Sequence, residues 1–568
     1  MPNFQLTPKP LITLWLCVFS AGADPLRPEN TDTLFNHNMQ QQQEQQKQLE
    51  AKSPDVYLSP PVVNTSLHFP EEHPCFVIDS VTMRGRESLP DWVPLQRLAN
   101  QAVGYCIGVN GINQLVSVLQ NRLIRHGWIT TRVLVPAQDL SSGNLQLVVL
   151  PGKVQDIRFT PKSDTYSSLY TATPAHKGNV LDLRDIEQGL ENLQRLPTVK
   201  ATVEMLPGDA PGDSVVVIDR QQSRFWRLGA WADNSGTTST GKNQAGVMVA
   251  FDNPLALSDL FYITATRDTS FRNSKNTANY SAHYSVPFGY WQFAATGSDY
   301  EYVQTVAGNY NDIQYRGKNK SLNLQLSRVL YRNASAKTSA SYDVNVRETR
   351  NFIADTEIES QKRRTSSWKA ALNHRHHVGQ STLTAGASYQ QGTRWFGALP
   401  ANEEFRPRDS DGYATALAQV MQFTAAFSVP FSLVSQRLRF DTQYLRQTSN
   451  TPLTPQDQFS IGNRWTVRGF DGERTLSADK GWSLRNTLSW ATPIPNQELY
   501  LGADYGEITR RGTDQNLGRH LAGGAIGLRG ALSPANLSYD VSLGTPFSKP
   551  DGFKTDSATF AFSVNWNY

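Results

Sequence analysis

The feature that most constrains the fold is a regular alternation of apolar and polar residues that recurs from residue 223 to the carboxy terminus. Leu322, Leu324 and Leu326, for example, alternate with Asn323, Gln325 and Ser327. The same pattern recurs at residues 342–347, 382–389 and 438–444. Because successive side chains of a strand point to opposite faces, each stretch predicts a strand with one apolar and one polar face. With no helical periodicity to cover a sheet, the region predicts a mainly β fold, closed into a barrel of roughly 16 tilted strands.

Composition narrows the class of protein. The mean hydropathy is −0.45, and no run of 18 apolar residues follows the amino terminus, which excludes a helical membrane protein but not a membrane barrel. The formal net charge is only +4, so we expect no nucleic-acid partner. Alternation alone leaves a soluble β-sandwich open.

The last nine residues favour the membrane barrel. Nine residues are enough for one tilted strand to cross a bilayer, and the chain ends on an aromatic residue, as expected for an interfacial girdle. The alternative is an ordinary edge strand. One face of this strand would carry Phe560, Phe562, Val564, Trp566 and Tyr568.

The amino terminus predicts export. Lys9, an apolar stretch over residues 11–19 and an Ala-Gly-Ala sequence at 21–23 fit a cleaved signal peptide over residues 1–23, and nine apolar residues are too few for a membrane anchor. Cleavage would remove Cys17 and leave Cys75 and Cys106, which in an exported chain most simply form one disulfide.

Two polar segments follow the signal. Residues 24–52 contain a glutamine-rich tract and predict either a disordered leader or a polar helix that rests in a water-filled lumen. Residues 53–70 carry four prolines and predict an extended linker.

Residues 71–151 and 152–220 predict two copies of a β-α-α-β-β unit. In the first copy we expect a strand over 77–83, a helix over 92–102 capped by Asp91, a chain break at 110–111, a helix from 112 that stops at Gly127, and strands over 129–135 and 145–150. The second copy has a helix capped by Asp182 and an alternating strand at 199–205.

Motifs for covalent chemistry are weak. Residues 236–243 resemble a phosphate-binding loop, but Asn243 replaces the hydroxyl that Mg²⁺ needs, so a hairpin turn is expected. His374, His376 and His377 lack nearby carboxylates or cysteines and predict a strand end rather than a metal site. We therefore predict no catalytic residue, metal or cofactor, although a barrel enzyme with scattered catalytic residues stays open.

One pairing stands out. Residues 461–482 form a glycine-rich stretch that contains Val467, Arg468, Gly469 and Phe470. In the strand predicted around residues 499–507, Asp504 lies between Gly502 and Gly506 on the polar face, with space for a long side chain. Because a guanidinium binds a carboxylate through two parallel hydrogen bonds, we predict a contact between Arg468 and Asp504.

Together these segments resemble the outer-membrane transporters of two-partner secretion, the TpsB family. The resemblance implies an amino-terminal plug helix (24–52), a linker (53–70), two periplasmic POTRA domains (71–151 and 152–220) and a 16-stranded transmembrane antiparallel β-barrel (221–568). It also implies that residues 461–482 fold back into the lumen with Val467 to Phe470 at the tip. Asp504 and Gly506 match the family's F-x-D-x-G wall motif, in which Gly502 replaces Phe, and the Cys75–Cys106 pair fits the first POTRA domain.

The implied function is export of one large β-helical exoprotein across the outer membrane of a Gram-negative bacterium, without ATP. The exoprotein could be a haemolysin, an adhesin or a contact-dependent growth-inhibition toxin. Expected partners are that exoprotein, outer-membrane lipid and the barrel-assembly machinery, which would recognise the aromatic carboxy-terminal strand. Two alternatives stay open: an insertase for other barrels, and a passive porin or barrel enzyme.

Overall fold

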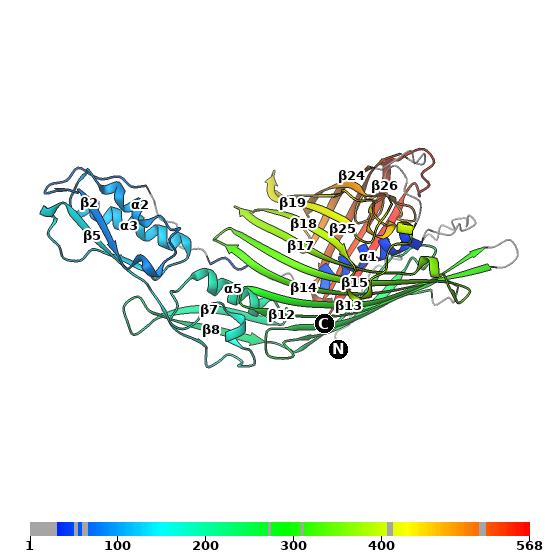
Figure 1. Ribbon diagram of the computed structural model, residues 1–568, viewed down its shortest axis with the longest axis horizontal. Helices are drawn as coiled ribbons and strands as arrows, with labels where there is room; N and C mark the ends of the chain where they lie inside the picture. Colours follow the sequence, from blue (N-terminus) through cyan, green and yellow to red (C-terminus); the bar gives the residue numbers. More distant parts are fainter. Residues whose placement is uncertain are drawn as a thin grey trace, which may run out of the picture.

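The structure is a computed structural model that describes residues 31–49, 55–58, 66–270, 274–307, 312–405, 413–509 and 518–568. The expected signal peptide, residues 1–23, lies outside the described residues. Three parts follow one another along the chain: a first small α/β domain, a second one packed on the barrel, and the barrel itself (Figure 1).

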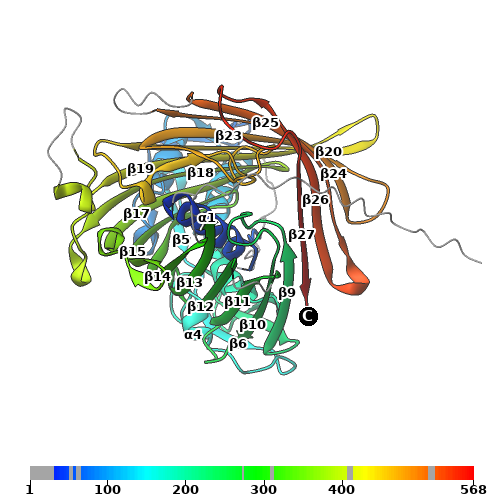
Figure 2. The same cartoon turned by 90° about the vertical axis from the view of Figure 1, so that its right-hand side faces the viewer.

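The carboxy-terminal part is a closed antiparallel barrel of 16 long strands, as predicted (Figure 2). Each strand pairs with its neighbours in sequence, and the last strand pairs with the first to close the ring. The closed ring excludes both the soluble sandwich and the edge-strand interpretation of the carboxy terminus. The barrel strands are β9 (Trp226–Asp233), β10 (Gln244–Asp252), β11 (Leu260–Asp268), β12 (Asn276–Phe288), β13 (Trp291–Ala307), β14 (Asp312–Arg332), β15 (Ala336–Ile353), β17 (Arg363–Val378), β18 (Ser381–Thr393), β19 (Gln419–Leu433), β20 (Gln436–Ser449), β23 (Lys480–Ala491), β24 (Gln497–Thr509), β25 (His520–Leu532), β26 (Leu537–Ser548) and β27 (Thr559–Asn567), with the two-residue β16 (Thr356–Glu357) added beside β15.

The two faces of the barrel wall differ as the alternation predicts. Leu322, Leu324 and Leu326 on β14 are 45%, 37% and 44% exposed on the outer face. Inward-facing polar residues such as Asp343 and Asp504 are buried at 2% and 4% exposure. Phe560 and Trp566 on β27, and Tyr568 just after it, are likewise exposed, so the terminal strand presents these aromatic side chains outward. This distribution suits a barrel with lipid outside and a polar lumen inside.

The first small domain, POTRA1, has the predicted β-α-α-β-β order around a three-stranded sheet ordered β2-β5-β4. The expected single strand over 77–83 is wrong: the chain divides into a short strand that pairs elsewhere and a strand of the main sheet. The elements are β1 (Phe76–Val77), β2 (Ser80–Arg84), η1 (Arg86–Ser88), α2 (Leu95–Ala99), η2 (Asn100–Ala102), β3 (Cys106–Ile107), α3 (Val109–His126), β4 (Arg132–Leu134), η3 (Leu140–Ser142) and β5 (Asn144–Leu150).

Two expectations about its helices are also wrong. Asp91 does not cap the first helix, because α2 begins only after Pro94, and a proline disfavours helical backbone in the residue before it. Residues 110–111 do not break the chain, since both lie in the first turn of α3. A Cβ at Gly111 would stand 2.5 Å from Ile107 Cγ2, so this glycine permits close packing rather than a turn. The predicted stop at Gly127 is correct, with a left-handed φ of 107°.

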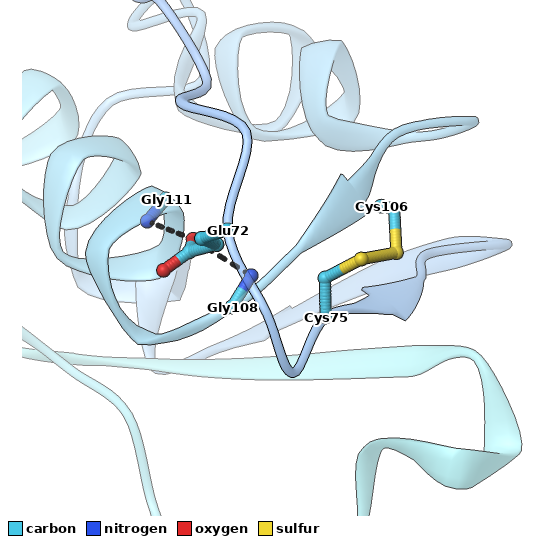
Figure 3. The surroundings of a disulfide bond; sticks show 5 residues. All are labelled: Glu72, Cys75, Cys106, Gly108 and Gly111. Atoms are coloured by element: carbon cyan, nitrogen blue, oxygen red, sulfur yellow. Dashed lines mark hydrogen bonds between the residues drawn. A yellow bond between two sulfur atoms is a disulfide. The ribbon is translucent and has the colours of Figure 1, made fainter.

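The disulfide and a carboxylate together hold the start of α3 (Figure 3). Cys75 bonds Cys106 across the two-stranded ribbon of β1 and β3, with a Cα–Cα distance of 5.3 Å. The Glu72 carboxylate accepts hydrogen bonds from the backbone amides of Gly108 and Gly111 at 2.8 Å each and of Asn110 at 2.9 Å. Desolvation opposes ionisation of Glu72, but these three amides outweigh it and hold the pKa of Glu72 below its usual value. The helix is thus capped from outside its own sequence.

The second small domain, POTRA2, contains a three-stranded sheet ordered β6-β8-β7. Asp182 caps the long helix as predicted and accepts a hydrogen bond from the Arg184 amide at 2.8 Å. Burial raises the pKa of Asp182 to about 6. The elements are β6 (Val154–Phe159), α4 (Leu169–Ala172), α5 (Leu183–Gln194), β7 (Val199–Pro207) and β8 (Ser214–Gln222).

POTRA2 packs directly on the mouth of the barrel. Leu196 and Val199 share a buried apolar cluster with Met248, Leu260 and Tyr262 from β10 and β11. Polar contacts continue this interface along the turns between barrel strands: Asn192 Nδ2 donates to Gly289 O at 2.7 Å, Tyr290 Oη to Asp185 Oδ1 at 2.6 Å, and Arg195 Nη2 to Ser285 Oγ at 2.6 Å. By the resemblance described above, this mouth is expected to be the periplasmic end of the barrel.

Helix α1 (Thr31–Leu49) lies inside the barrel (Figure 2). Leu34 packs against Tyr300 and Tyr302 of β13. The remaining contacts are polar, as befits a helix with little apolar surface. No helix in the described part of the chain is long and apolar enough to cross a membrane.

Candidate functional site: a loop tip anchored to the barrel wall

The connection between β20 and β23 does not pass over the rim but folds back into the lumen. Its two short strands, β21 (Phe459–Ile461) and β22 (Leu476–Ala478), pair with each other, and the 14 residues between them carry the tip. The connection begins at the end of the barrel opposite to POTRA2, so the loop enters from the extracellular side. η7 (Pro455–Asp457) precedes β21.

Local chemistry shapes the tip. The Asn463 side-chain oxygen accepts hydrogen bonds from the backbone amides of Trp465 and Thr466, at 3.0 and 3.1 Å, and so builds an Asx-type turn. Gly469 then has a left-handed φ of 97°, which side chains with a Cβ rarely adopt. The two turns bring Arg468 against the wall at β24.

Arg468 and Asp504 form a buried bidentate ion pair. Arg468 Nε donates to Asp504 Oδ2 at 2.7 Å, and Arg468 Nη2 donates to Asp504 Oδ1 at 2.7 Å. The backbone amide of Arg468 donates to the same carboxylate at 2.9 Å. The Asp504 side chain has no exposed surface and that of Arg468 is 10% exposed. A pair with this geometry is strong and directional, and it leaves little water to compete for the hydrogen bonds.

The guanidinium also binds the neighbouring strand. Arg468 Nη2 donates to the Asn486 backbone oxygen at 2.8 Å and to Thr487 Oγ1 at 3.1 Å, both on β23. One side chain thus joins the loop tip to two adjacent strands of the wall.

A seam of glycines makes room for the tip. A Cβ at Gly502 would lie 2.4 Å from Arg468 Cζ, so the guanidinium occupies the space that a side chain at this position would need. A Cβ at Gly523 would lie 2.1 Å from Arg468 O, and one at Gly544 would lie 2.9 Å from Gly469 Cα. Gly506 faces Val467, whose Cγ2 would be 3.0 Å from an added Cβ. The wall over β24, β25 and β26 is therefore shaped to the loop backbone.

Apolar packing seals both sides of the ion pair. Val467 is fully buried and Phe470 is 3% exposed. Phe470 contacts Phe553 edge to face, with ring centroids 5.8 Å apart. They belong to a cluster with Phe459, Ile461, Leu476, Ala478, Ile508 and Leu521. An apolar cluster inside a polar lumen holds the loop to one place on the wall.

The tip borders a cavity lined by charges of both signs. Its volume is about 660 Å³, and its lining includes the arginines Arg464, Arg468, Arg485 and Arg529 and the carboxylates of Glu44, Asp233, Asp441 and Asp540. Arg485 Nη1 donates to the Trp465 backbone oxygen at 2.9 Å and so also holds the loop. Space remains in the lumen beside the loop and the helix.

Asn234, which the sequence analysis did not single out, links the loop to the barrel seam. Arg464 Nη2 donates to Asn234 Oδ1 at 2.7 Å. The same oxygen accepts from the Phe562 amide at 2.9 Å, and Asn234 Nδ2 donates to the Phe560 backbone oxygen at 2.8 Å. The lumenal loop therefore contacts the place where β27 meets β9. An asparagine in a turn carries no sequence signal for such a role.

Helix α1 contacts the loop and the wall through neutral groups. Asn463 Nδ2 donates to Gln40 Oε1 at 2.5 Å, and the His37 ring lies edge-on to Trp465 with centroids 5.0 Å apart. Gln41 Nε2 donates to Gln244 Oε1 at 2.6 Å and to Ser235 Oγ at 2.7 Å, and Gln42 Nε2 donates to Asn279 Oδ1 at 2.9 Å.

The remaining predicted residues lie elsewhere. The Cys75–Cys106 disulfide is in POTRA1, and the exposed aromatic residues of β27 face outward, away from the tip. Residues 236–243 connect β9 to β10, as expected of a hairpin, and His374, His376 and His377 lie at the end of β17. Among the described residues no group of three or more His, Cys, Asp or Glu side chains is placed to hold a metal ion.

Comparison with known proteins identifies the relatives. Residues 212–530 match the family model described as haemolysin secretion/activation protein ShlB/FhaC/HecB. Residues 76–152 match a POTRA domain of ShlB type, and residues 153–207 match a second POTRA model.

Individual relatives agree with the family model. The chain is 33% identical to the outer membrane transporter CdiB-2 of Burkholderia pseudomallei, over 94% of this chain and 95% of that protein. It is 28% identical to the hemolysin transporter protein ShlB of Serratia marcescens, over 84% and 83% of the two chains. Among solved structures, CdiB from Escherichia coli superposes with a TM-score of 0.84 at 29% identity, and covers 94% of this chain and 98% of its own.

These relatives are transporters, and they do not favour the insertase or porin interpretations. The closed barrel and the two POTRA domains agree with the family matches along the chain. The protein therefore belongs to the ShlB/FhaC/HecB family of two-partner secretion transporters of the outer membrane, with its POTRA domains in the periplasm.

Proposed function

We propose that this transporter exports an exoprotein of the contact-dependent growth-inhibition type. Four similar relatives carry the name CdiB, at 29% to 33% identity, whereas the two haemolysin transporters are 27% and 28% identical. The difference in identity is small but consistent, and the CdiB matches also extend over more of the chain, at 94% to 98% against 83% and 84%.

The observation that carries the proposed mechanism is the buried contact between Arg468 and Asp504. It supports a role for the loop as a fixed internal element that shapes the lumen, with Val467, Gly469 and Phe470 fitting the tip to the wall at Gly506. In this mechanism no residue performs covalent chemistry, and the export step needs no ATP or cofactor.

Each other part has a role in the same proposal. The POTRA domains capture the unfolded secretion domain of the exoprotein, for which an open sheet edge offers strand addition. Helix α1, which belongs to the expected plug segment 24–52, closes the pore at rest. The outward aromatic residues of β27, Phe560, Phe562, Trp566 and Tyr568, serve as the insertion signal read by the barrel-assembly machinery and then contact outer-membrane lipid. The Cys75–Cys106 disulfide stabilises POTRA1.

Co-expression tests the proposal. The transporter is produced in a Gram-negative host with the secretion domain of a CdiA-type exoprotein or of a haemolysin, and each secreted fragment is quantified in the medium. We expect export of the CdiA-type fragment well above that of the haemolysin fragment. Equal export would contradict the cargo assignment, and export of neither fragment by a correctly inserted barrel would contradict the transport of these exoproteins.

A further inference from the structure

A short segment of the expected linker is bound in the crevice between POTRA2 and the barrel. We call residues 55–58 the strap. It lies between α5 on one side and the periplasmic ends of β14, β15 and β17 on the other. The linker composition predicted an extended chain but not a binding partner.

The strap backbone is held by buried charged side chains. The amide of Val56 donates to Glu191 Oε1 at 2.9 Å, and the amide of Leu58 donates to Glu187 Oε1 at 2.6 Å. Arg332 donates to the Val56 backbone oxygen. The side chains of Glu187, Glu191 and Arg332 are 0%, 5% and 1% exposed. Since Glu187 and Glu191 are one helical turn apart, they match alternate amides of an extended peptide.

The side chains of Val56, Tyr57 and Leu58 contact different parts of the crevice. Val56 and Leu58 pack against the apolar core of POTRA2. The ring of Tyr57 lies 5.5 Å from Arg332 Cζ and edge-on to His377, with centroids 5.2 Å apart. An alternating arrangement of apolar and aromatic positions is how an extended peptide is recognised.

Asp55 occupies a basic corner of the crevice. Lys337 Nζ donates to Asp55 Oδ1 at 2.9 Å, and Arg375 Nη1 donates to Asp55 Oδ2 at 2.6 Å. His377 Nε2 lies 3.4 Å from the same carboxylate. Burial opposes ionisation of Asp55, but Lys337 and Arg375 outweigh it and lower its pKa to about 2. An occupant without a carboxylate would leave these cations without that partner.

The strap also contains one unsatisfied buried polar group. Within the described part of the chain, the buried Tyr57 hydroxyl has no hydrogen-bond partner. An unsatisfied buried hydroxyl weakens binding, because its hydrogen bonds to water are lost and not replaced. The crevice therefore holds a recognisable peptide at less than its full strength, which suits an occupant that is exchanged.

We propose that this crevice is a peptide-binding site, that the strap occupies it at rest, and that an extended segment of the exported chain takes its place during secretion. The incoming segment carries an acidic residue in the place of Asp55 and apolar residues in the places of Val56 and Leu58. The last part rests on the proposed function, because the crevice lies at the mouth through which cargo would enter the lumen.

Binding is tested on the full chain in detergent micelles with a fluorescein-labelled peptide of residues 53–60. In the strap-vacated variant, residues 55–58 are all glycine and every crevice residue is retained. We expect saturable binding to this variant and at least roughly tenfold weaker binding to the wild type, whose strap competes at high effective concentration. Absence of binding to the strap-vacated variant would overturn the site.

Peptide variants test the contacts. The peptide with Asp55→Asn should bind several-fold more weakly, and the peptide with Tyr57→Phe several-fold more tightly. If neither substitution changes the affinity, the peptide is held by apolar contacts alone, which would contradict the proposal. Lys337→Met in the strap-vacated variant should reduce the preference for Asp over Asn, and its combination with Arg375→Met should abolish that preference. An unchanged preference in the double variant would contradict the assigned role of these two cations.

Exchange is tested in proteoliposomes. The double variant Asp55→Cys, Lys337→Cys is joined by a short bismaleimide and compared with the unjoined form for export of a secretion-domain fragment. We expect joining to stop export, with the bismaleimide-treated wild type unaffected because Cys75 and Cys106 form the disulfide and Cys17 belongs to the expected signal peptide. Full export by the joined form would overturn the exchange. Failure of the untreated wild type to export would instead contradict the proposed function.

Discussion

Two elements lie in the lumen, the loop tip and helix α1, and they are held by different kinds of contact. The loop tip is held by a buried bidentate ion pair, a glycine seam and an apolar cluster. Helix α1 is held by side-chain amides, by the His37 ring and by one leucine packed against two tyrosines. A neutral hydrogen bond contributes only about 1 kcal/mol net, because water replaces it when the helix leaves. Breaking a buried ion pair leaves a charge without a partner. The contrast indicates a loop built to stay and a helix built to be released.

Removing the arginine should have the largest effect on export. Arg468→Ala leaves Asp504 buried without its partner, at a cost of about 3–5 kcal/mol. We expect correct insertion but export reduced by more than roughly tenfold, since 1.4 kcal/mol already shifts an equilibrium tenfold. Secreted fragment is measured against the amount of folded barrel. Arg439→Ala is the control, because Arg439 also pairs with carboxylates of the wall, Asp441 and Glu498, but does not touch the loop. Normal export by Arg468→Ala would refute the anchor.

Crowding the wall should have the next largest effect. Gly502→Ala places a methyl group 2.4 Å from Arg468 Cζ and forces the guanidinium to move. Overpacking of this kind costs about 1–3 kcal/mol. We expect reduced export and faster proteolysis within residues 461–482. Gly297→Ala on the outer part of β13 is the matched control, since its nearest neighbour would be 4.0 Å away. An unchanged proteolysis rate would argue against close packing at the seam.

Deleting the helix should affect export much less. Removal of Thr31–Leu49 takes away only neutral and weakly apolar contacts, so the barrel and the anchored loop should persist. We expect higher ion conductance in planar bilayers while export stays within roughly twofold of the wild type. If conductance does not rise, α1 does not close the pore. If export is lost as completely as in Arg468→Ala, the contrast between the two elements fails.

Weakening one helix contact should have the smallest effect. Gln41→Ala removes two hydrogen bonds, to Ser235 and Gln244, together about 2 kcal/mol at most. We expect more frequent opening events in single-channel recordings and no change in export. Gln43→Ala is the control because Gln43 is exposed. Equal gating of the two variants would mean that Gln41 does not hold the helix.

Much of the architecture could be predicted from the sequence because it depends on local periodicity. Alternation in β14 and β27 predicted strands with one lipid-facing side, and the leucine spacing before Gly127 predicted α3. The contact of Arg468 with Asp504 was also predictable, since a carboxylate between two glycines on a polar face calls for a long cationic partner.

The features that could not be predicted from the sequence depend on which strands become neighbours. Gly523 and Gly544 complete the seam only because β25 pairs with β24, and β26 with β25, in a particular register, which no local pattern encodes. Asn234 reaches β27 only after the ring closes. The strap illustrates the same limit, because Glu187 on α5 lies far in the sequence both from the strap and from Arg332 and Lys337 on the barrel.

Local errors had local causes. The first helix of POTRA1 was expected from Trp92, but Pro94 delays it to Leu95. Gly111 was interpreted as a break, whereas the external carboxylate of Glu72 caps α3 and makes a glycine useful within its first turn. A glycine that serves close packing cannot be distinguished by sequence from one that serves a turn.

The glutamine tract of α1 has an environmental consequence. Gln41 and Gln42, and their partners Gln244 and Asn279, carry no charge at any pH that a bacterium meets. Contacts between neutral groups are also little screened by dissolved ions, in contrast to surface ion pairs. These amide contacts therefore hold equally in acidic or alkaline water and in dilute or salty water. A change in the medium would act instead on the titratable side chains of the helix, such as His37, whose ring nitrogen lies 2.6 Å from the Ser235 backbone oxygen.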